Sequence, residues 1–432
     1  MAQIGSKTMD VDVLGIGFGP AAISFGCVIE DLVEERGSNP VGSVLFLEKA
    51  EETAWHPELI LPNTDINHHV FRDLVTPRNP RSRFSFAMYL KEKGRLHRFG
   101  LLGRPASRLE WSDYVAWTAK QLAHHVRYNE HVTEILPGLS GGALTHFEVV
   151  TSSGIVRAKN LVVSTGVCPR VPALFHDHLG PRVFHTSEYL SRISALAGDF
   201  PKRWLVVGSG QSASEATSDL LQRRPDIRVH SLHRSSGFKL TQLGNFPNLI
   251  FSPEQVDYFH SLDLPARKRL FADVKATNYS GIDPDESQKL YSLVYEEAIM
   301  GRETLKMVVY SEVAAVTRTP GGYAVTVRDV FSGEERTFEV DGIVLATGYD
   351  QPLIPPLFST LLPWLALDAD GGVAIDRNYR VGLSGNALAH IFMNGLSERT
   401  HGISDGQSFS LMALRSERIL TSILALQGRQ AG

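Results

Sequence analysis

Two glycine-rich turns, about two hundred residues apart, constrain this chain most strongly, because each lies between a short apolar strand and a helix. The first turn, Gly15 to Pro20, follows the β-branched segment 10–14, and the second, beginning at Gly208, follows the apolar segment 204–207. Glycine lets the backbone turn tightly and approach a pyrophosphate held at the N-terminus of the next helix. One such motif alone can be a plain glycine turn, but two in the same context predict two dinucleotide-binding units.

The residues that end the partner strands distinguish the two units. Glu48 follows the predicted strand 44–47, where an acid can bind both hydroxyls of a ribose. The strand 229–232 ends instead at His233 and Arg234, and a base there can accept the 2′-phosphate of NADPH, so NADPH is favoured over NADH. The alternative for Arg234 is an ordinary surface arginine.

Length and composition exclude several classes of protein. A chain of 432 residues with 43% hydrophobic residues is long enough for two or three domains. The formal charge of -4 implies no strong field for nucleic acid, and Cys27 and Cys168 are too far apart for a disulfide scaffold, a zinc ribbon or a CxxC dithiol. The N-terminus lacks the pattern of a secretory signal, and glycines interrupt the apolar run 11–29, so we expect a cytoplasmic protein without a membrane span.

The order of elements predicts an α/β fold with two Rossmann-like dinucleotide-binding domains and a small, mostly helical substrate-binding region. Strands are predicted at residues 10–14, 44–47, 147–151, 155–158, 160–166, 204–207, 229–232, 308–316, 323–327, 336–340 and 342–348. Helices are predicted at residues 21–25, 84–92, 111–123, from 213 to about 221, and 408–426, with a long loop at 55–81 and mostly helical structure at 245–303. We expect an FAD-binding domain at residues 1–170 and 341–432, and an NADPH-binding domain at 171–340 that contains the helical region.

Longer motifs are spread over nearly the whole chain. They are Ala54–Trp55–His56–Pro57, Leu61–Pro62, residues 71–76, Pro80, residues 108–114, 184–189, 208–213 and 277–279, Ala346–Thr347–Gly348–Tyr349, and residues 401–405. Together they resemble the motifs of the microbial flavin-dependent N-hydroxylating monooxygenases, the ornithine and lysine N-hydroxylases of siderophore biosynthesis. The ending 410–416 is most similar to the lysine-type enzymes.

The resemblance implies an NADPH- and O2-dependent flavin monooxygenase that N-hydroxylates a primary amine through a C4a-hydroperoxyflavin. NADPH reduces FAD, and one oxygen atom passes to an uncharged amine in a dry, polar pocket. No metal is required, and neither His68–His69 nor His124–His125 has a third ligand in register in the sequence. The family also implies a homo-oligomer, commonly a tetramer.

The resemblance assigns roles to individual residues. Asn67 and Asn278 are expected near the flavin and the reacting amine, in catalytic positions. The expected substrate-binding residues are Arg72, Asn248, Asn278 and Ser410, with Ser408 as the competing choice because the stretch after Asp405 is one residue longer here. The expected cofactor-binding residues are Gly15, Gly17, Gly19, Pro20, Glu48, Lys49, Trp55, His56, Asn67, Gly208, Gly210, Gln211, Ser212, Arg234, Thr347, Tyr349 and Ser408.

Two positions depart from the family pattern at the substrate end. Asn67 stands where the family has a glutamine, and Arg72 where it has a lysine that holds the substrate carboxylate. A guanidinium can grip a carboxylate or a phosphonate with two hydrogen bonds, so this exchange is not neutral, although a family variation with an unchanged substrate is the alternative. The expected substrate is L-ornithine or L-lysine; aspartate, an aminophosphonate and a diamine are the alternatives.

Other proteins with two dinucleotide units match the chain less well. A pyridine nucleotide–disulfide reductase needs a close dithiol, which Cys27 and Cys168 do not supply. A Baeyer–Villiger or sulfur-oxidising relative would have a glycine and a later His–Trp arrangement that segment 184–189 lacks. The remaining alternatives are a non-hydroxylating flavin oxidoreductase and a non-catalytic flavin-binding protein, and the intact motifs at both cofactor sites disfavour the second.

Overall fold

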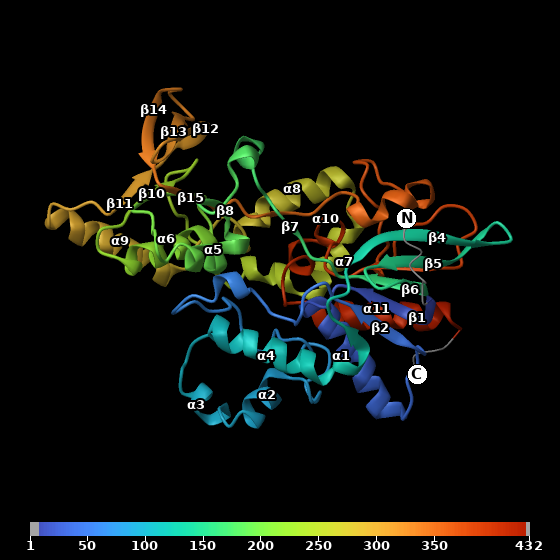
Figure 1. The fold of residues 1–432 in the computed structure, drawn as a ribbon. Coiled ribbons are helices and arrows are strands. Elements are labelled where there is room, and N and C mark those ends of the chain that lie inside the picture. Colours follow the sequence, from blue (N-terminus) through green and yellow to red (C-terminus); the bar gives the residue numbers. More distant parts are fainter. Residues whose placement is uncertain (1–7, 429–432) are drawn as a thin grey trace.

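The first glycine turn lies in a mixed β-sheet. The computed structural model describes residues 8–428, and within them this sheet has seven strands (Figure 1). They are β1 (Thr8–Ile16), β2 (Val44–Leu47), β3 (Val126–Arg127), β4 (Val132–Ser140), β5 (Ala143–Thr151), β6 (Ile155–Val163) and β17 (His390–Met393). Their order is β3–β2–β1–β6–β5–β4, with β17 paired to β6. The pairs around β1 are parallel and those among β4, β5 and β6 are antiparallel, so a βαβ unit is extended by a meander.

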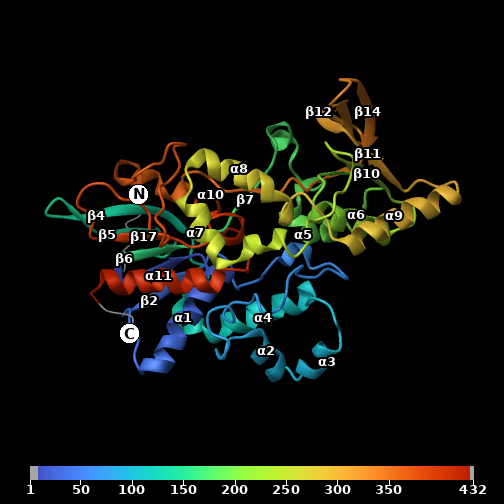
Figure 2. The ribbon, with the colours of Figure 1, turned by 180° about the vertical axis from the view of Figure 1, so that it is seen from behind.

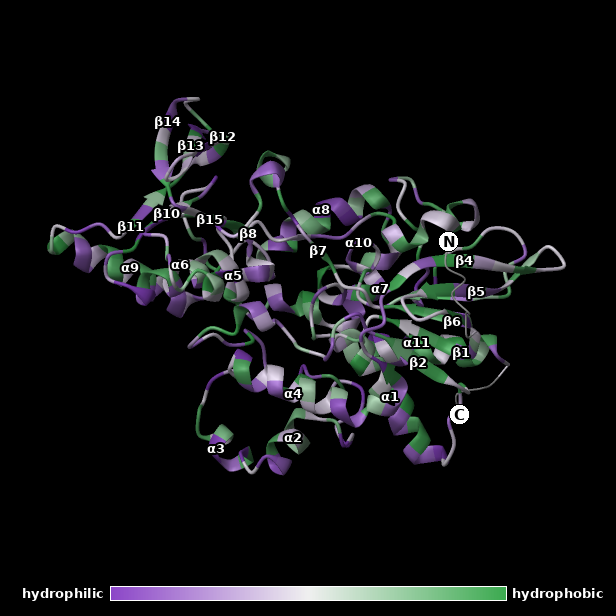
Figure 3. Ribbon diagram, in the orientation of Figure 1, coloured by the Kyte–Doolittle hydropathy of each residue, from purple (hydrophilic) through white to green (hydrophobic). Residues whose placement is uncertain are grey.

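Hydrophobic layers cover both faces of the first sheet. The helices α1 (Pro20–Arg36), α4 (Arg108–Gln121) and α11 (Met412–Leu426) share one core with Phe46, and Figure 2 shows α11 lying across the sheet. The segment η7 (Pro356–Trp364) buries Phe358 and Leu361 in the core that contains Leu161 and Ile391. Figure 3 shows that β1 and β6 are largely hydrophobic, as expected for strands covered on both faces.

The second glycine turn lies in a separate, parallel sheet. Its strands are β8 (Val183–His185), β9 (Arg203–Val207), β10 (Arg228–Leu232), β11 (Leu305–Val308) and β15 (Gly342–Leu345), in the order β11–β10–β9–β15–β8. The helices α5 (Tyr189–Ala195), α6 (Gln211–Arg223) and α9 (Pro284–Ile299) accompany it. The domain boundary predicted at residue 341 is therefore wrong, because β15 pairs with β9 and belongs to this sheet. We call the two assemblies the first unit and the second unit.

A small antiparallel sheet extends from the second unit. It consists of β12 (Ser311–Thr319), β13 (Gly322–Asp329) and β14 (Glu335–Val340). The predicted strand 308–316 is wrong at its start, because Val308 ends β11 of the parallel sheet. Tyr310 then adopts a left-handed conformation, with φ of 51°, which separates β11 from β12.

The chain crosses between the two units at one place. There β7 (Cys168–Pro169) pairs with the antiparallel strand β16 (Tyr349–Asp350). The N–H of Arg170 also donates to the carbonyl oxygen of Gly348 at 2.9 Å. The outgoing and returning segments are thus held side by side.

The helical structure predicted for residues 245–303 is confirmed. It consists of η5 (Pro247–Phe251), α7 (Pro253–Ser261), α8 (Leu264–Val274), η6 (Lys275–Thr277) and α9. Helix α7 packs on α10 (Glu398–His401), and η5 packs on η8 (Ile403–Asp405), so this part of the region lies against the first unit, whereas α9 packs on α6 of the second. The other elements are η1 (Pro57–Leu59), α2 (Phe86–Glu92), α3 (Leu96–Gly100), η2 (Ala123–His125), η3 (Ala173–His178) and η4 (Thr186–Glu188). No helix among the described residues is long and apolar enough to cross a membrane.

Candidate active site

The first glycine turn leaves open space in front of a helix N-terminus. Gly17 has φ of 87°, and a Cβ there would lie 2.6 Å from the carbonyl oxygen of Ser164, so only glycine fits. Gly15 lies at the end of β1, Gly19 is the N-cap of α1, and Pro20 is its first residue. No atom lies within 4 Å of a Cβ built on Gly19. The exposed N–H groups of a helix start can bind a phosphate in this space.

Glu48 lies beside this turn, as predicted from its place at the end of β2. Its Oε2 accepts a hydrogen bond from the N–H of Phe18 at 2.7 Å, and its Oε1 accepts one from Ala50 at 3.0 Å. The next residue, Lys49, is exposed. A helix start, an open glycine turn and a fixed carboxylate fit the adenosine and pyrophosphate parts of FAD.

An aromatic cluster lies next to the first unit's nucleotide turn. The ring of Phe409 contacts Trp55 at 5.6 Å, His68 at 5.7 Å and Trp111 at 5.4 Å between centroids, and His56 stacks edge-on against Trp55 at 4.6 Å. Burial lowers the pKa of His68 to about 4, so this ring is neutral at pH 7. The sequence prediction missed Phe409, although it lies between the two predicted serines.

Arg72 and Ser410 come together from opposite ends of the chain. The Nη1 of Arg72 donates to the Oγ of Ser410 at 3.3 Å, and Ser408 donates to the same oxygen at 2.9 Å. The guanidinium carbon also lies 5.3 Å from the ring centre of Phe251 in η5. Within residues 8–428, no carboxylate forms an ion pair with this half-buried arginine, and burial lowers its pKa. The site thus holds a positive charge without a protein counter-charge.

The three predicted asparagines are not joined to one another by hydrogen bonds. Asn67 is exposed and has φ of 55°, a conformation that asparagine tolerates. The Nδ2 of Asn248 donates to the carbonyl oxygens of Gln242 and Gly244, both at 2.9 Å, so it shapes its own loop. Asn278 is exposed at the end of η6.

A half-buried acid that the sequence prediction missed lies next to Asn278. The hydroxyl of Tyr279 donates to the Oε2 of Glu398 in α10. Burial raises the pKa of Glu398 to about 7, even though the Tyr279 hydrogen bond and the charge of Lys275 lower it. Nothing in the sequence around Glu398 indicates this contact, because its partner lies 119 residues away.

The second glycine turn repeats the geometry of the first. Gly208 has φ of 145°, and a Cβ there would lie 2.3 Å from the carbonyl oxygen of Ala346. Gly210 is the N-cap of α6, and Ser212 lies half-buried in its first turn. Arg234 is exposed just beyond the end of β10. A helix start with a cation at the neighbouring strand end fits the phosphates of NADPH.

Gln211 connects the second turn to an ion pair between the units. Its Nε2 donates to the Oε1 of Glu215 at 3.1 Å, and its Oε1 accepts the N–H of Asp283 at 3.0 Å. Glu215 in α6 accepts two hydrogen bonds, of 2.7 and 2.8 Å, from Arg108 in α4. The side-chain amide of Gln211 is therefore hydrogen-bonded within the protein. The sequence motif 108–114 includes Arg108 but does not predict its ion pair with Glu215.

Thr347 and Tyr349 lie at the crossing between the units. The Thr347 hydroxyl donates to the carbonyl oxygen of Arg170. Tyr349 pairs with Pro169, and its ring lies 5.1 Å from that of His185. These contacts give both residues a structural role in the crossing.

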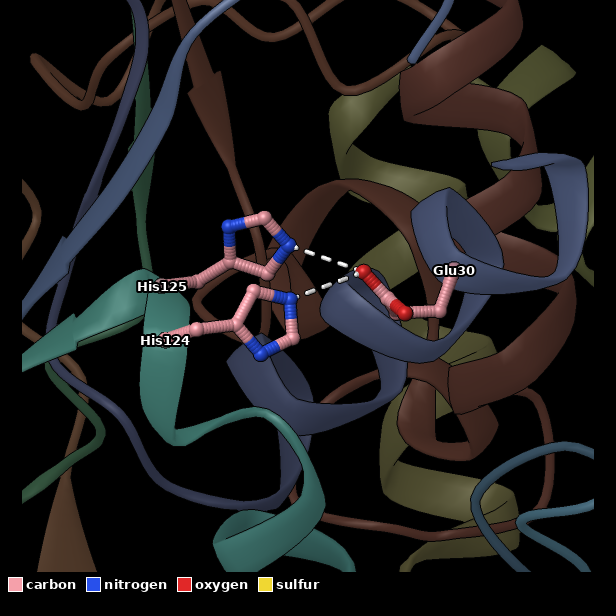
Figure 4. Close-up of side chains that lie close together, drawn as sticks. All are labelled: Glu30, His124 and His125. Atoms are coloured by element: carbon pink, nitrogen blue, oxygen red, sulfur yellow. Dashed lines mark hydrogen bonds and ion pairs between the residues drawn. The ribbon is translucent and has the colours of Figure 1, made fainter. Parts of the chain in front are cut away.

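The His124–His125 pair, which has no third ligand in register in the sequence, meets a carboxylate in the folded chain. Figure 4 shows both imidazoles directed at Glu30. The Nε2 atoms lie 3.1 and 3.0 Å from its Oε1. Glu30 lies in α1, more than ninety residues before the histidines, so sequence spacing could not reveal it.

Comparisons with known proteins agree with this geometry. The family model described as L-lysine 6-monooxygenase/L-ornithine 5-monooxygenase matches residues 9–351. The L-ornithine N(5)-monooxygenase of Pseudomonas aeruginosa is 32% identical over 98% of this chain and 96% of its own length. The crystal structure of L-lysine 6-monooxygenase from Pseudomonas syringae has 55% identity and a TM-score of 0.89, with 96% of this chain and 99% of that chain covered. The ornithine N-hydroxylase of Kutzneria sp. 744, solved with reduced FAD, NADP+ and L-ornithine, has 33% identity and a TM-score of 0.91, with 97% of this chain and 100% of that chain covered.

Proposed function

Since the chain belongs to the L-lysine 6-monooxygenase/L-ornithine 5-monooxygenase family, we propose that it hydroxylates the side-chain amine of L-lysine or L-ornithine, and that Arg72 holds the substrate carboxylate. The chain is an FAD- and NADPH-dependent N-hydroxylating monooxygenase, like its relatives. L-Lysine is the first choice, because the L-lysine 6-monooxygenase of P. syringae has the higher identity of the solved structures named above.

The two units divide the cofactors between them. The first unit would hold FAD through Gly17, Gly19 and Glu48, and the second would hold NADPH through Gly210 and Arg234. When bound, FAD reduced by NADPH would activate O2, of which one oxygen atom goes to the amine and the other leaves as water. The protein's own part is to orient the amine, to keep it uncharged and to exclude water.

The unpaired charge of Arg72 is the observation that carries the substrate proposal. A half-buried guanidinium without a carboxylate partner is costly unless a ligand supplies the anion. The α-carboxylate of an amino acid matches the planar fork of arginine. The Ser410 hydroxyl, which accepts from Arg72, and the ring of Phe251 fix the direction of this fork. A diamine has no carboxylate and would leave Arg72 unpaired.

An amine screen tests the reaction and the substrate together. The FAD-loaded enzyme would be given NADPH, oxygen and one amine at a time from L-lysine, L-ornithine, putrescine, cadaverine, aspartate and an aminophosphonate. We expect a hydroxylamine, detected by mass, with one basic amino acid and coupled NADPH oxidation. Hydrogen peroxide as the sole product with every amine would contradict the hydroxylase function. A hydroxylated diamine as the best product would contradict the amino-acid substrate and the role of Arg72, but not the hydroxylase function.

Two variants of Arg72 test the carboxylate contact. Arg72→Ala should raise the KM for the amino acid by roughly 100-fold, because a charge-assisted bidentate contact contributes about 3 kcal/mol. Arg72→Lys, which restores the residue usual in the family, should recover most of this loss. FAD content should stay normal in both variants. An unchanged KM in Arg72→Ala would remove Arg72 from the substrate site.

A further inference from the structure

A cluster of one carboxylate and two imidazoles lies apart from the glycine turns and from Arg72. Glu30 belongs to α1, whereas His124 and His125 form the short η2 segment between α4 and β3. The oxygen and the two Nε2 atoms all lie within 4.8 Å of one another. Figure 4 shows the two rings reaching the same carboxylate oxygen side by side.

The separations match those of neighbouring ligands around a small divalent ion. With metal–ligand bonds of about 2.0–2.2 Å, two ligands at tetrahedral or right angles lie about 3.0–3.5 Å apart. The observed distances from Oε1 to the two Nε2 atoms are 3.1 and 3.0 Å. The two oxygen–nitrogen separations are therefore compatible with one ion bound between the carboxylate and the imidazoles.

Burial and charge favour a structured site with one open side. The side chains of Glu30 and His125 are each 13% exposed, whereas that of His124 is 56% exposed, which leaves access for water and for the ion. Arg83 approaches the other oxygen of Glu30, Oε2, at 3.2 Å. Oε1 therefore stays directed at the histidines, and the carboxylate is held in place by an independent contact.

The donor set selects the class of ion. Two imidazole nitrogens and one carboxylate oxygen suit Zn²⁺ and its neighbours in the first transition row. Mg²⁺ and Ca²⁺ prefer an all-oxygen shell and would find only one carboxylate here. We propose that Glu30 Oε1, His124 Nε2 and His125 Nε2 form a binding site for Zn²⁺, with water in the remaining coordination position.

Binding at this site would fasten α1 to the segment that leads into the edge strand β3. Because the ligands lie 94 and 95 residues apart and meet only in the folded chain, zinc would bind the native state preferentially and stabilise it. No step of the amine hydroxylation passes through these residues, so zinc binding can be measured independently of activity.

Calorimetric titration of the untagged, full-length, FAD-loaded protein with Zn²⁺ tests the site. The protein would first be treated with a chelator and desalted. We expect one zinc ion per chain and a raised midpoint of thermal unfolding, with no comparable effect of Mg²⁺. His124→Ala, His125→Ala and Glu30→Gln should each weaken binding by at least about tenfold, since each removes one of three ligands.

His97→Ala is the matched control, because His97 is an exposed histidine on α3 that lies outside the cluster. His124→Ala is the variant least able to disturb folding, because more than half of its side chain is exposed. Absence of saturable zinc binding would overturn the proposal. So would zinc binding that survives unchanged in His124→Ala and Glu30→Gln, because the ion would then be bound elsewhere.

Discussion

Replacing Glu215 by glutamine removes one charge of the ion pair that joins the two units. Arg108 and Glu215 are 11% and 2% exposed in their side chains, and two hydrogen bonds of 2.7 and 2.8 Å link them. Glutamine keeps the shape of the side chain but leaves the guanidinium buried without a counter-charge. Breaking a buried pair in this way costs about 3–5 kcal/mol. We expect the lower end, about 3 kcal/mol, because Arg108 also donates to the carbonyl oxygen of Leu59 at 2.9 Å.

Urea unfolding of the FAD-loaded protein measures this loss. Tryptophan fluorescence and flavin release would be followed in parallel, because a chain with two units can unfold in more than one step. Glu188→Gln is the matched control. Its partner Arg192 lies on the same helical face, and the two side chains are 51% and 37% exposed, so its removal should cost no more than about 0.5 kcal/mol.

A double variant separates the lost charge pair from lost packing. Arg108→Leu combined with Glu215→Leu removes both charges, and apolar replacement of a buried pair is often neutral or stabilising. The double variant should therefore be more stable than Glu215→Gln. The reasoning is refuted if Glu215→Gln unfolds at the same urea concentration as Glu188→Gln, or if the double variant is the least stable of the set.

Two further residues yield predictions of different kinds. Burial raises the pKa of Glu398 from 4.5 to about 7, so the folded state binds this proton more tightly than the unfolded state does. Up to about 3 kcal/mol of the free energy of unfolding should therefore be lost as the pH rises from about 4.5 to 7. Glu398→Gln should remove this pH dependence, and urea midpoints at pH 5 and pH 8 that shift equally in variant and wild type would contradict it. Arg234→Ala should raise the KM for NADPH about tenfold and leave that for NADH unchanged, since only NADPH carries the 2′-phosphate. Equal effects on both nucleotides in steady-state kinetics would argue against this contact.

Sequence patterns predicted the strands, turns and helices whose formation depends on interactions between neighbouring residues. The strand, glycine turn and helix around Gly17 and around Gly208 appear where predicted, because glycine placement and strand hydrophobicity act over a few residues. β4 and β17 lie outside the predicted strands. β17 pairs with β6, which lies about 230 residues earlier in the chain, and no pattern in the sequence of β17 identifies this partner.

The candidate active site likewise depends on contacts between residues far apart in the sequence, which local patterns do not predict. The meeting of Arg72 and Ser410, 338 residues apart, could be expected only from the family resemblance, since no periodicity connects them. Glu30 and Glu398 were missed because their roles arise from partners on other elements. The predicted boundary at residue 341 is misplaced for a related reason. β15 is as hydrophobic as the strands of the first sheet, and only its pairing with β9 shows that it belongs to the second sheet.

The paired crossing strands β7 and β16 make the second unit a removable insertion. Residues that face each other across antiparallel strands, such as Pro169 and Tyr349, are about 5 Å apart, so the first unit could be closed by a bridge of two or three residues once the segment between them is cut out. The same adjacency places the two covalent connections between the units side by side. Away from these connections, the Arg108–Glu215 pair and the packing of α7 on α10 hold the inserted segment against the first unit.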